Sequence, residues 1–116
     1  MPGISIHVVD VTRGVAASGM RVEVFSIGEA RSRIVSGEVS PSGIVDDAAL
    51  SARFAPGAYD VLLHVGAFYA RAGFALPVVP FLDVAMFRFG IADAEQHYHL
   101  PFKLTPWGYS CFRGGA

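Results

Sequence analysis

Apolar and polar side chains alternate along most of this 116-residue chain, which is the pattern of β-strands buried on one face. In the first such run, Ile4, Ile6 and Val8 fall on one side of an extended backbone. His7 therefore lies on the side opposite the expected core. Further strands are predicted over residues 20–25, 34–39, 58–65, 83–89 and 98–104, with a short edge piece at 68–71 and a last strand after the turn beyond residue 104. About eight short strands joined by turns predict an all-β fold, a sandwich of two sheets.

Two segments depart from this alternation. Residues 46–54 begin with two aspartates, continue with good helix formers and carry apolar side chains at 50 and 54. They predict the one short helix of the chain, ended by Pro56 and Gly57. Residues 76–80 hold two prolines, which cannot sit inside a sheet, and are predicted to form a loop.

The length allows one domain, residues 1–116, and the composition limits its partners. The chain has 9 Lys and Arg against 10 Asp and Glu, and no basic run is longer than two residues. A nucleic-acid partner is therefore not expected. The composition is 53% hydrophobic and only 16% charged, which is more apolar than a small soluble monomer can cover with polar surface. This composition predicts that apolar surface is buried between copies of the chain.

The single cysteine and the first residues predict a cytoplasmic protein. Cys111 cannot form an internal disulfide, which favours a reducing compartment. The first ten residues lack the positively charged start and long apolar run of a secretory signal. No stretch reaches the roughly 20 apolar residues that a membrane-spanning helix needs, so no membrane partner is expected.

Three of the four histidines are candidates for chemistry. His97 and His99 share one face of a predicted strand, and His7 lies in the middle of another. Imidazole titrates near neutral pH, so one ring can take a proton from water while another holds the substrate. Composition alone favours the simpler interpretation that these are surface or interface residues without a catalytic task.

The same histidines raise the question of a metal. A His-x-His pair with a third histidine has the composition of a zinc site. Zinc hydrolases also need carboxylates that orient the imidazoles, and Asp10 is the only obvious candidate near these motifs. We therefore expect no metal. Cys111 has no neighbouring base to activate it and is expected to be a small interior side chain, and no phosphate-binding glycine motif predicts a cofactor.

Two segments of the sequence carry a family resemblance. Residues 3–14, GISIHVVDVTRG, and residues 97–115, HYHLPFKLTPWGYSCFRGG, resemble the 5-hydroxyisourate hydrolase family, the transthyretin-like enzymes of urate breakdown. The resemblance implies a transthyretin-like sandwich, cofactor-free hydrolysis of a cyclic amide, and a homotetramer with each site in a channel between paired dimers. It places His7 and His99 in the site. It gives no role to His97 and His64: we expect His97 to face solvent and His64 to lie on a sheet surface.

The end of the second segment resembles the family ending GYSTYRGS but differs from it at three positions. Cys111 replaces Thr, Phe112 replaces Tyr and Gly115 replaces Ser. The retained Arg113 is expected to hold a carbonyl or a developing negative charge with two parallel hydrogen bonds, an interface salt bridge being the alternative. Ser110 is expected either to donate a hydrogen bond to the substrate or to line the mouth of the site. Phe112 is expected to contact the substrate.

The largest departure is Ile44, which follows a turn glycine where the family usually has an Arg of the site. Loss of such a donor commonly costs about 3 kcal/mol of transition-state stabilisation when the substrate still presents the same polar atom. Either the activity is lost, or the substrate presents an apolar group at Ile44. Phe112 and Gly115 also remove hydroxyls, which favours the second explanation.

The expected function is therefore hydrolysis of the lactam ring of 5-hydroxyisourate or of an N-methylated 5-hydroxyisourate from methylxanthine or methylurate catabolism. His7 and His99 would polarise and deprotonate a water, Arg113 would steady the oxyanion, and Ile44 would pack against a methyl group. The alternative is a non-catalytic, transthyretin-like small-ligand-binding protein. Carriers of this fold lack the two histidines, which favours the enzyme.

Overall fold

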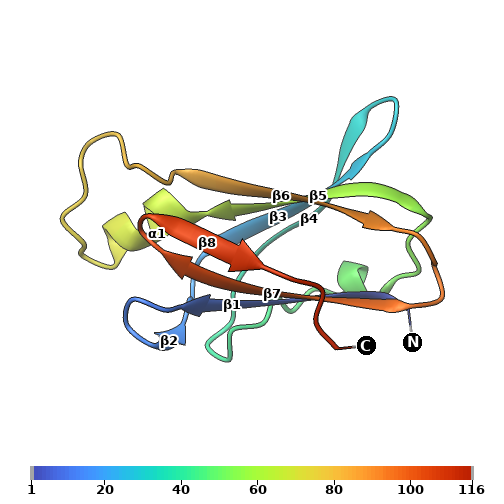
Figure 1. Cartoon of the computed structure of the whole chain (residues 1–116), viewed down its shortest axis with the longest axis horizontal. Helices are drawn as coiled ribbons and strands as arrows, with labels where there is room; N and C mark the ends of the chain where they lie inside the picture. The colour runs from blue at the N-terminus through green and yellow to red at the C-terminus, as the bar shows by residue number, and fades with distance from the viewer. Residues whose placement is uncertain (1, 116) are drawn as a thin grey trace.

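The computed structural model describes residues 2–115, which form two four-stranded sheets stacked as layers (Figure 1). The elements in chain order are β1 (Gly3–Asp10), β2 (Val15–Ala16), β3 (Arg21–Ile27), β4 (Arg31–Glu38), the 3₁₀-helix η1 (Ala48–Ser51), β5 (Gly57–His64), α1 (Val65–Arg71), β6 (Val84–Ile91), β7 (His97–Thr105) and β8 (Gly108–Cys111). One sheet has the strand order β2-β1-β7-β8 and the other β4-β3-β5-β6. The predicted two-sheet sandwich of about eight strands is confirmed.

The core lies between the two sheets and follows the alternation in the sequence. Ile4, Ile6 and Val8 of β1 are buried, as are Leu100 and Phe102 of β7. The intervening residues of both strands point away from the core and are only partly buried. One face of the β2-β1-β7-β8 sheet is therefore free to carry polar groups.

Strands β1 and β7 run parallel, whereas every other pair of strands is antiparallel. In this register Ser5 lies opposite His99 and His7 lies opposite Pro101. The two segments that carry the histidines are far apart in the sequence, and this pairing joins them into one sheet face.

The predicted helix over residues 46–54 is wrong. Only the short 3₁₀-helix η1 forms there, where the Asp47 side chain accepts a hydrogen bond from the Ala49 N–H at 2.9 Å. Ala52 then returns to an extended conformation with φ −71° and ψ 165°. Leu50 is already buried within this single turn, so a longer helix is not needed to bury the apolar side chain.

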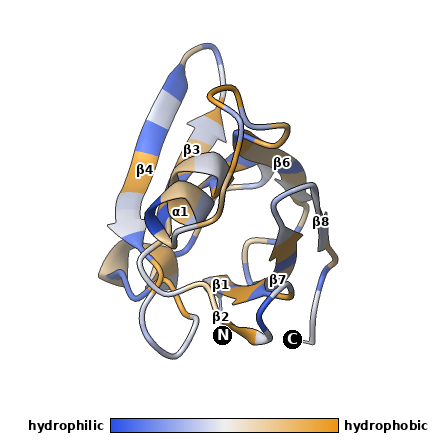
Figure 2. Cartoon of the chain, turned by 90° about the vertical axis from the view of Figure 1, so that its left-hand side faces the viewer, coloured by the Kyte–Doolittle hydropathy of each residue, from blue (hydrophilic) through white to orange (hydrophobic). Residues whose placement is uncertain are grey.

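The α-helix lies instead at Val65–Arg71, where the end of a strand and the edge piece at 68–71 were predicted. Val65, Phe68 and Tyr69 are buried, which is the three- and four-residue spacing of one helix face. This helix lies at the end of the sandwich that faces the viewer in Figure 2. No helix within residues 2–115 is long and apolar enough to cross a membrane.

A buried polar cluster fixes α1 to the first sheet. Tyr69 donates its hydroxyl proton to Asp10 over 2.6 Å, and Arg13 donates from Nε to the other carboxylate oxygen, also over 2.6 Å. Asp10 is 0% exposed, and its charge is balanced by Arg13, whose own side chain is 40% exposed. The Arg13 guanidinium also lies over the rings of Phe68 and Phe74, at 5.6 and 5.4 Å from their centroids.

Candidate functional site

Ser5 links two of the histidines on the outer face of the β2-β1-β7-β8 sheet. Its Oγ lies 2.8 Å from Nε2 of His97 and 2.6 Å from Nδ1 of His99. The expectation that His97 faces solvent is corrected, because the ring is partly buried and hydrogen-bonded on both sides, with Nδ1 3.3 Å from the Pro2 carbonyl. The alternation along β1 places Ser5 on the same face as His7, and this was the available signal that it belongs with the histidines.

His7 stands against the turn between β4 and η1. Its backbone forms a bridge with Ile44, and the N–H of Val8 donates to the Gly43 carbonyl over 2.8 Å. A Cβ added at Gly43 would lie 2.7 Å from Nε2 of His7. The absence of a side chain at Gly43 therefore makes room for the His7 ring.

Replacing Gly43 with alanine is expected to lower the free energy of unfolding by about 2–4 kcal/mol. Gly43 has φ +90°, so alanine adds backbone strain of about 1 kcal/mol as well as the contact with His7. Gly19 provides a matched control, because it has the same φ of +90° but no atom within 4 Å of an added Cβ. Urea unfolding of both variants should show the larger loss for Gly43→Ala; equal losses would mean that His7 moves aside freely.

His99 has the electrostatics of a base. Its pKa is lowered from the usual 6.5, first because partial burial penalises the charged ring and second because His7 and His97 repel a positive charge. The ring is therefore neutral at neutral pH and can accept a proton.

Arg113 is held beside these histidines by the chain that follows β8. Its Nη2 donates to Oε1 of Gln96 over 2.9 Å and to the carbonyl of His97 over 3.3 Å, and its guanidinium stacks on the Tyr98 ring, 4.1 Å from the centroid. The N–H of Gly114 donates to the His99 carbonyl over 2.8 Å, which ties this segment to β7. The guanidinium is exposed and has donors left for a ligand.

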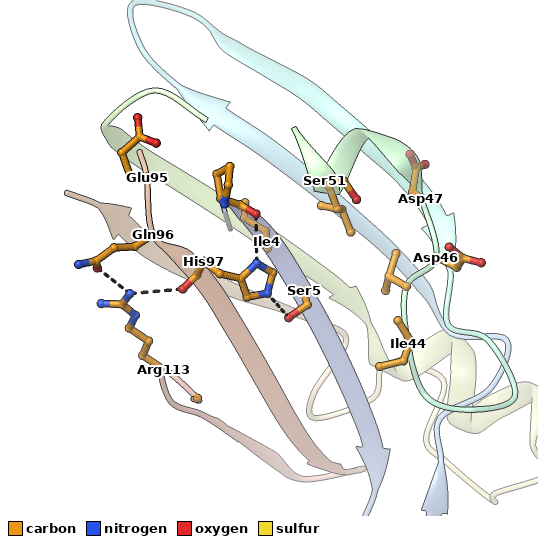
Figure 3. A pocket seen from close by; sticks show the side chains of 14 residues that line it. Ile4, Ser5, Ile44, Asp46, Asp47, Ser51, Glu95, Gln96, His97 and Arg113 are labelled. Carbon is orange, nitrogen blue, oxygen red and sulfur yellow. Dashed lines mark hydrogen bonds between the residues drawn. The ribbon is translucent and has the colours of Figure 1, made fainter. Parts of the chain in front are cut away.

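An open groove of about 1340 Å³ lies beside this cluster (Figure 3). Ser5, His97 and Arg113 contribute to its lining, and Ile44 lies across Ser5 and His97 from Arg113. The other lining residues are Pro2, Ile4, Val45, Asp46, Asp47, Leu50, Ser51, Glu95, Gln96 and Gly114. The groove thus has a guanidinium at Arg113 on one side, and on the other side Ile44 lies together with Asp46, Asp47 and Ser51 (Figure 3).

His7 and His99 lie beside this groove but are not among the residues that line it, and the remaining candidates also lie outside its lining. Ser110 is exposed on β8 opposite Lys103, and Phe112 is exposed just after β8. Cys111 is partly buried, and burial raises the pKa of its thiol to about 11, which keeps it protonated. His64 lies in the other sheet, where Nε2 is 2.7 Å from Oε1 of Glu23.

Within residues 2–115, no group of three or more histidine, cysteine or acidic side chains is arranged to hold a metal ion. His7 and His97 lie close enough to His99 for their charge to lower its pKa. The Ser5 hydroxyl, however, occupies the position between His97 and His99. The chemistry that the arrangement supports directly is acid–base, with a neutral imidazole and a guanidinium near one groove.

Comparisons with known proteins find relatives of this chain both by sequence and by structure. The model of the Transthyretin family, described as HIUase/Transthyretin family, matches residues 4–114. The chain is 39% identical over 113 residues to 5-hydroxyisourate hydrolase 2 of Rhizobium meliloti (strain 1021), covering 96% of this chain and 94% of that protein. The structure of Klebsiella pneumoniae 5-hydroxyisourate hydrolase matches 99% of this chain and 100% of its own, with a TM-score of 0.81 and 29% identity. The structure of (S)-allantoin synthase matches 97% of this chain with a TM-score of 0.89 and 28% identity, and this chain spans 43% of that longer one.

Proposed function

Because this chain belongs to the HIUase/Transthyretin family, we propose that it is a hydrolase that opens the lactam ring of 5-hydroxyisourate or of an N-methylated 5-hydroxyisourate. The observation that carries the proposal is the placement of His99, a neutral imidazole hydrogen-bonded to Ser5, near His7 and close to the groove that Arg113 lines. The assignment of the whole chain to one hydrolase domain is part of the proposal.

The proposed mechanism is attack of water on the ring carbonyl. His99 takes one proton from the water as its oxygen bonds to the carbonyl carbon, and His7 polarises the same water. Arg113 donates hydrogen bonds to the oxyanion that forms. The carbon–nitrogen bond then breaks, and the leaving nitrogen receives the proton held by His99. These steps use only side chains of the chain, with no metal or cofactor.

Ile44 is proposed to select the methylated substrate. It replaces the Arg that the family resemblance places here. The groove lining on this side holds the apolar side chains of Ile4, Val45 and Leu50 and also the polar ones of Asp46, Asp47 and Ser51. A methyl group on the substrate would gain from contact with the Ile44 side chain, whereas a ring N–H that faced this side chain would lose its hydrogen bonds. One methyl group in such a pocket commonly changes kcat/KM by roughly 10- to 200-fold.

The test is the decay of ultraviolet absorbance of freshly generated 5-hydroxyisourate and of its N-methylated analogue, corrected for the spontaneous rate. The wild type is expected to prefer the methylated compound by about tenfold or more in kcat/KM, and Ile44→Arg should shift the preference toward the unmethylated one. Ile44→Val retains an apolar surface and serves as the control. Equal or better turnover of the unmethylated compound by the wild type contradicts the methyl assignment. Acceleration of neither compound contradicts the enzyme and favours the small-ligand-binding alternative.

We also infer a homotetramer that works in the cytoplasm. The groove is open and larger than the roughly 300–1,000 Å³ of an ordinary ligand pocket, as expected where another copy supplies a wall. Edge strands β6 and β8 expose large apolar side chains in or beside them, namely Val84, Met86, Trp107, Tyr109 and Phe112. Exposed apolar side chains at sheet edges favour pairing between copies. The position of Ser110 and Phe112 near such an edge would allow them to reach a substrate held between copies.

A further inference from the structure

The Ser5 hydroxyl lies between two imidazoles, and its single proton can point to only one of them. The separations are 2.8 Å to Nε2 of His97 and 2.6 Å to Nδ1 of His99. A hydroxyl donates one hydrogen bond and accepts on its lone pairs, while a neutral imidazole carries one N–H and one bare nitrogen. The direction of these linked hydrogen bonds decides which nitrogen of His99 is unprotonated.

The Pro2 carbonyl fixes the direction of the hydrogen bonds that link His97, Ser5 and His99. Nδ1 of His97 lies 3.3 Å from this oxygen, and a carbonyl oxygen only accepts, so Nδ1 carries the proton of the neutral ring. Nε2 of His97 is then bare and accepts the proton of the Ser5 hydroxyl. Ser5 has no second proton, so its oxygen accepts from Nδ1–H of His99. The remaining nitrogen of His99, Nε2, keeps its lone pair.

The opposite direction has a cost that the inferred one avoids. It would require a proton on Nε2 of His97, which either removes the proton that faces the Pro2 carbonyl or makes His97 a cation beside His7 and His99. In the inferred direction His99 can gain a proton at Nε2 and lose it again while Nδ1 donates to Ser5 throughout. The hydrogen bonds need no rearrangement during such a proton transfer.

Nε2 of His99 is also within reach of water. The ring forms its side-chain hydrogen bond through Nδ1, and within residues 2–115 no fully buried side-chain nitrogen or oxygen lacks a partner. Nε2 has no such partner in this part of the chain, so it is not fully buried. A Cβ added at Gly114, which lines the groove, would lie 2.5 Å from the adjacent Cδ2. This edge of the ring therefore lies beside the groove.

We propose that Ser5 and His97 are positioning residues that hold His99 in the tautomer whose bare Nε2 accepts the proton of the attacking water. The hydrogen bond between Ser5 and His97 is visible in Figure 3. The proposal rests on the hydrolase function proposed above and adds the two residues that prepare its base. Neither residue touches the reacting atoms; they act through the orientation and protonation of His99.

The first test is the tautomer itself, read from the ¹⁵N chemical shifts of the imidazoles at a pH where they are neutral. Wild-type His99 is expected as the Nδ1–H tautomer, and Ser5→Thr, which keeps the hydroxyl, should leave it unchanged. Ser5→Ala should give a mixture of tautomers. His97→Phe frees the Ser5 proton to point at His99 and should favour the Nε2–H form. A wild-type His99 found as Nε2–H overturns the proposal, as does an unchanged tautomer in both Ser5→Ala and His97→Phe.

The second test separates positioning from structure by kinetics. Ser5→Ala is expected to lower kcat by about tenfold or more with little change in KM, and Ser5→Thr to retain most of the wild-type rate. Ser26→Ala, another partly buried strand serine but in the other sheet, is the control and should keep wild-type kinetics. Equal loss in Ser5→Ala and Ser5→Thr contradicts the proposal. An inactive wild type refutes the hydrolase while the tautomer measurement still stands, so the two failures are distinguishable.

Discussion

Replacing His99 with alanine is expected to lower kcat for ring opening by roughly 10²- to 10⁴-fold, because the proposed general base is removed. His99 is not among the residues that line the groove, so KM should change much less than kcat. The measurement is the initial rate of ultraviolet decay after subtraction of the spontaneous reaction. His64→Gln, in the other sheet, is the matched control and should keep the wild-type rate. A His99→Ala variant within about threefold of the wild-type kcat would exclude His99 as the base.

The pH dependence of the wild type tests the same assignment. A base works only when unprotonated, and burial together with His7 and His97 lowers the pKa of His99 below 6.5. The rate of ring opening should therefore stay constant as the pH falls to 6.5 and decline only at lower pH. His7→Ala removes one repelling charge and should move the acid limb of the pH–rate profile to higher pH. An acid limb above the ordinary histidine value in the wild type contradicts this arrangement.

Replacing Asp10 with alanine is expected to lower the free energy of unfolding by about 3 kcal/mol. The carboxylate is fully buried and accepts hydrogen bonds from Tyr69, Arg13 and the backbone N–H of Thr12. Its loss removes these bonds and opens a small cavity. Tyr69→Phe removes one hydroxyl and leaves the ion pair of Asp10 with Arg13, so it should cost about 1 kcal/mol. Urea unfolding near neutral pH measures both, and comparable losses would show that the charge of Asp10 contributes nothing.

The same cluster predicts how stability depends on pH. Burial alone would raise the pKa of Asp10, but the hydrogen bonds from Tyr69 and Arg13 outweigh it and hold the pKa below its usual value. A carboxyl group with a depressed pKa stabilises the fold fully above its unfolded-state pKa and loses that contribution as the pH falls through its folded-state pKa. Acid unfolding of the wild type should show this loss, and Asp10→Ala should lack it.

The alternation of side chains was sufficient to predict most strands, because a buried face requires an apolar residue at every second position. It failed at α1, since Val65 is β-branched and continues the apolar run of β5 directly into the helix. The helical spacing of Phe68 and Tyr69 relative to Val65 was present but short, only one turn long. At residues 46–54 the helix signals were local, and the chain used the Asp47 cap for a 3₁₀ turn instead.

Part of the candidate site could be read from the sequence and part required the strand pairing. The outward orientation of His7 followed from the buried side chains beside it, and His97 and His99 had to share a face. Nothing in a single segment showed that β1 would pair in parallel with β7, which is what puts Ser5 between His97 and His99. His97 was therefore assigned to solvent although it forms hydrogen bonds on both sides of its ring.

The parallel pairing of β1 with β7 also sets the time at which this site can exist during protein synthesis. Ser5 is made before its partners His97 and His99, which follow 92 and 94 residues later. A ribosome-bound chain that has not yet released β7 has an unpaired β1 edge and lacks the proposed base His99. The proposed activity therefore begins only when β7 emerges, and until then the exposed edge of β1 is the part that a chaperone would have to shield from other strands.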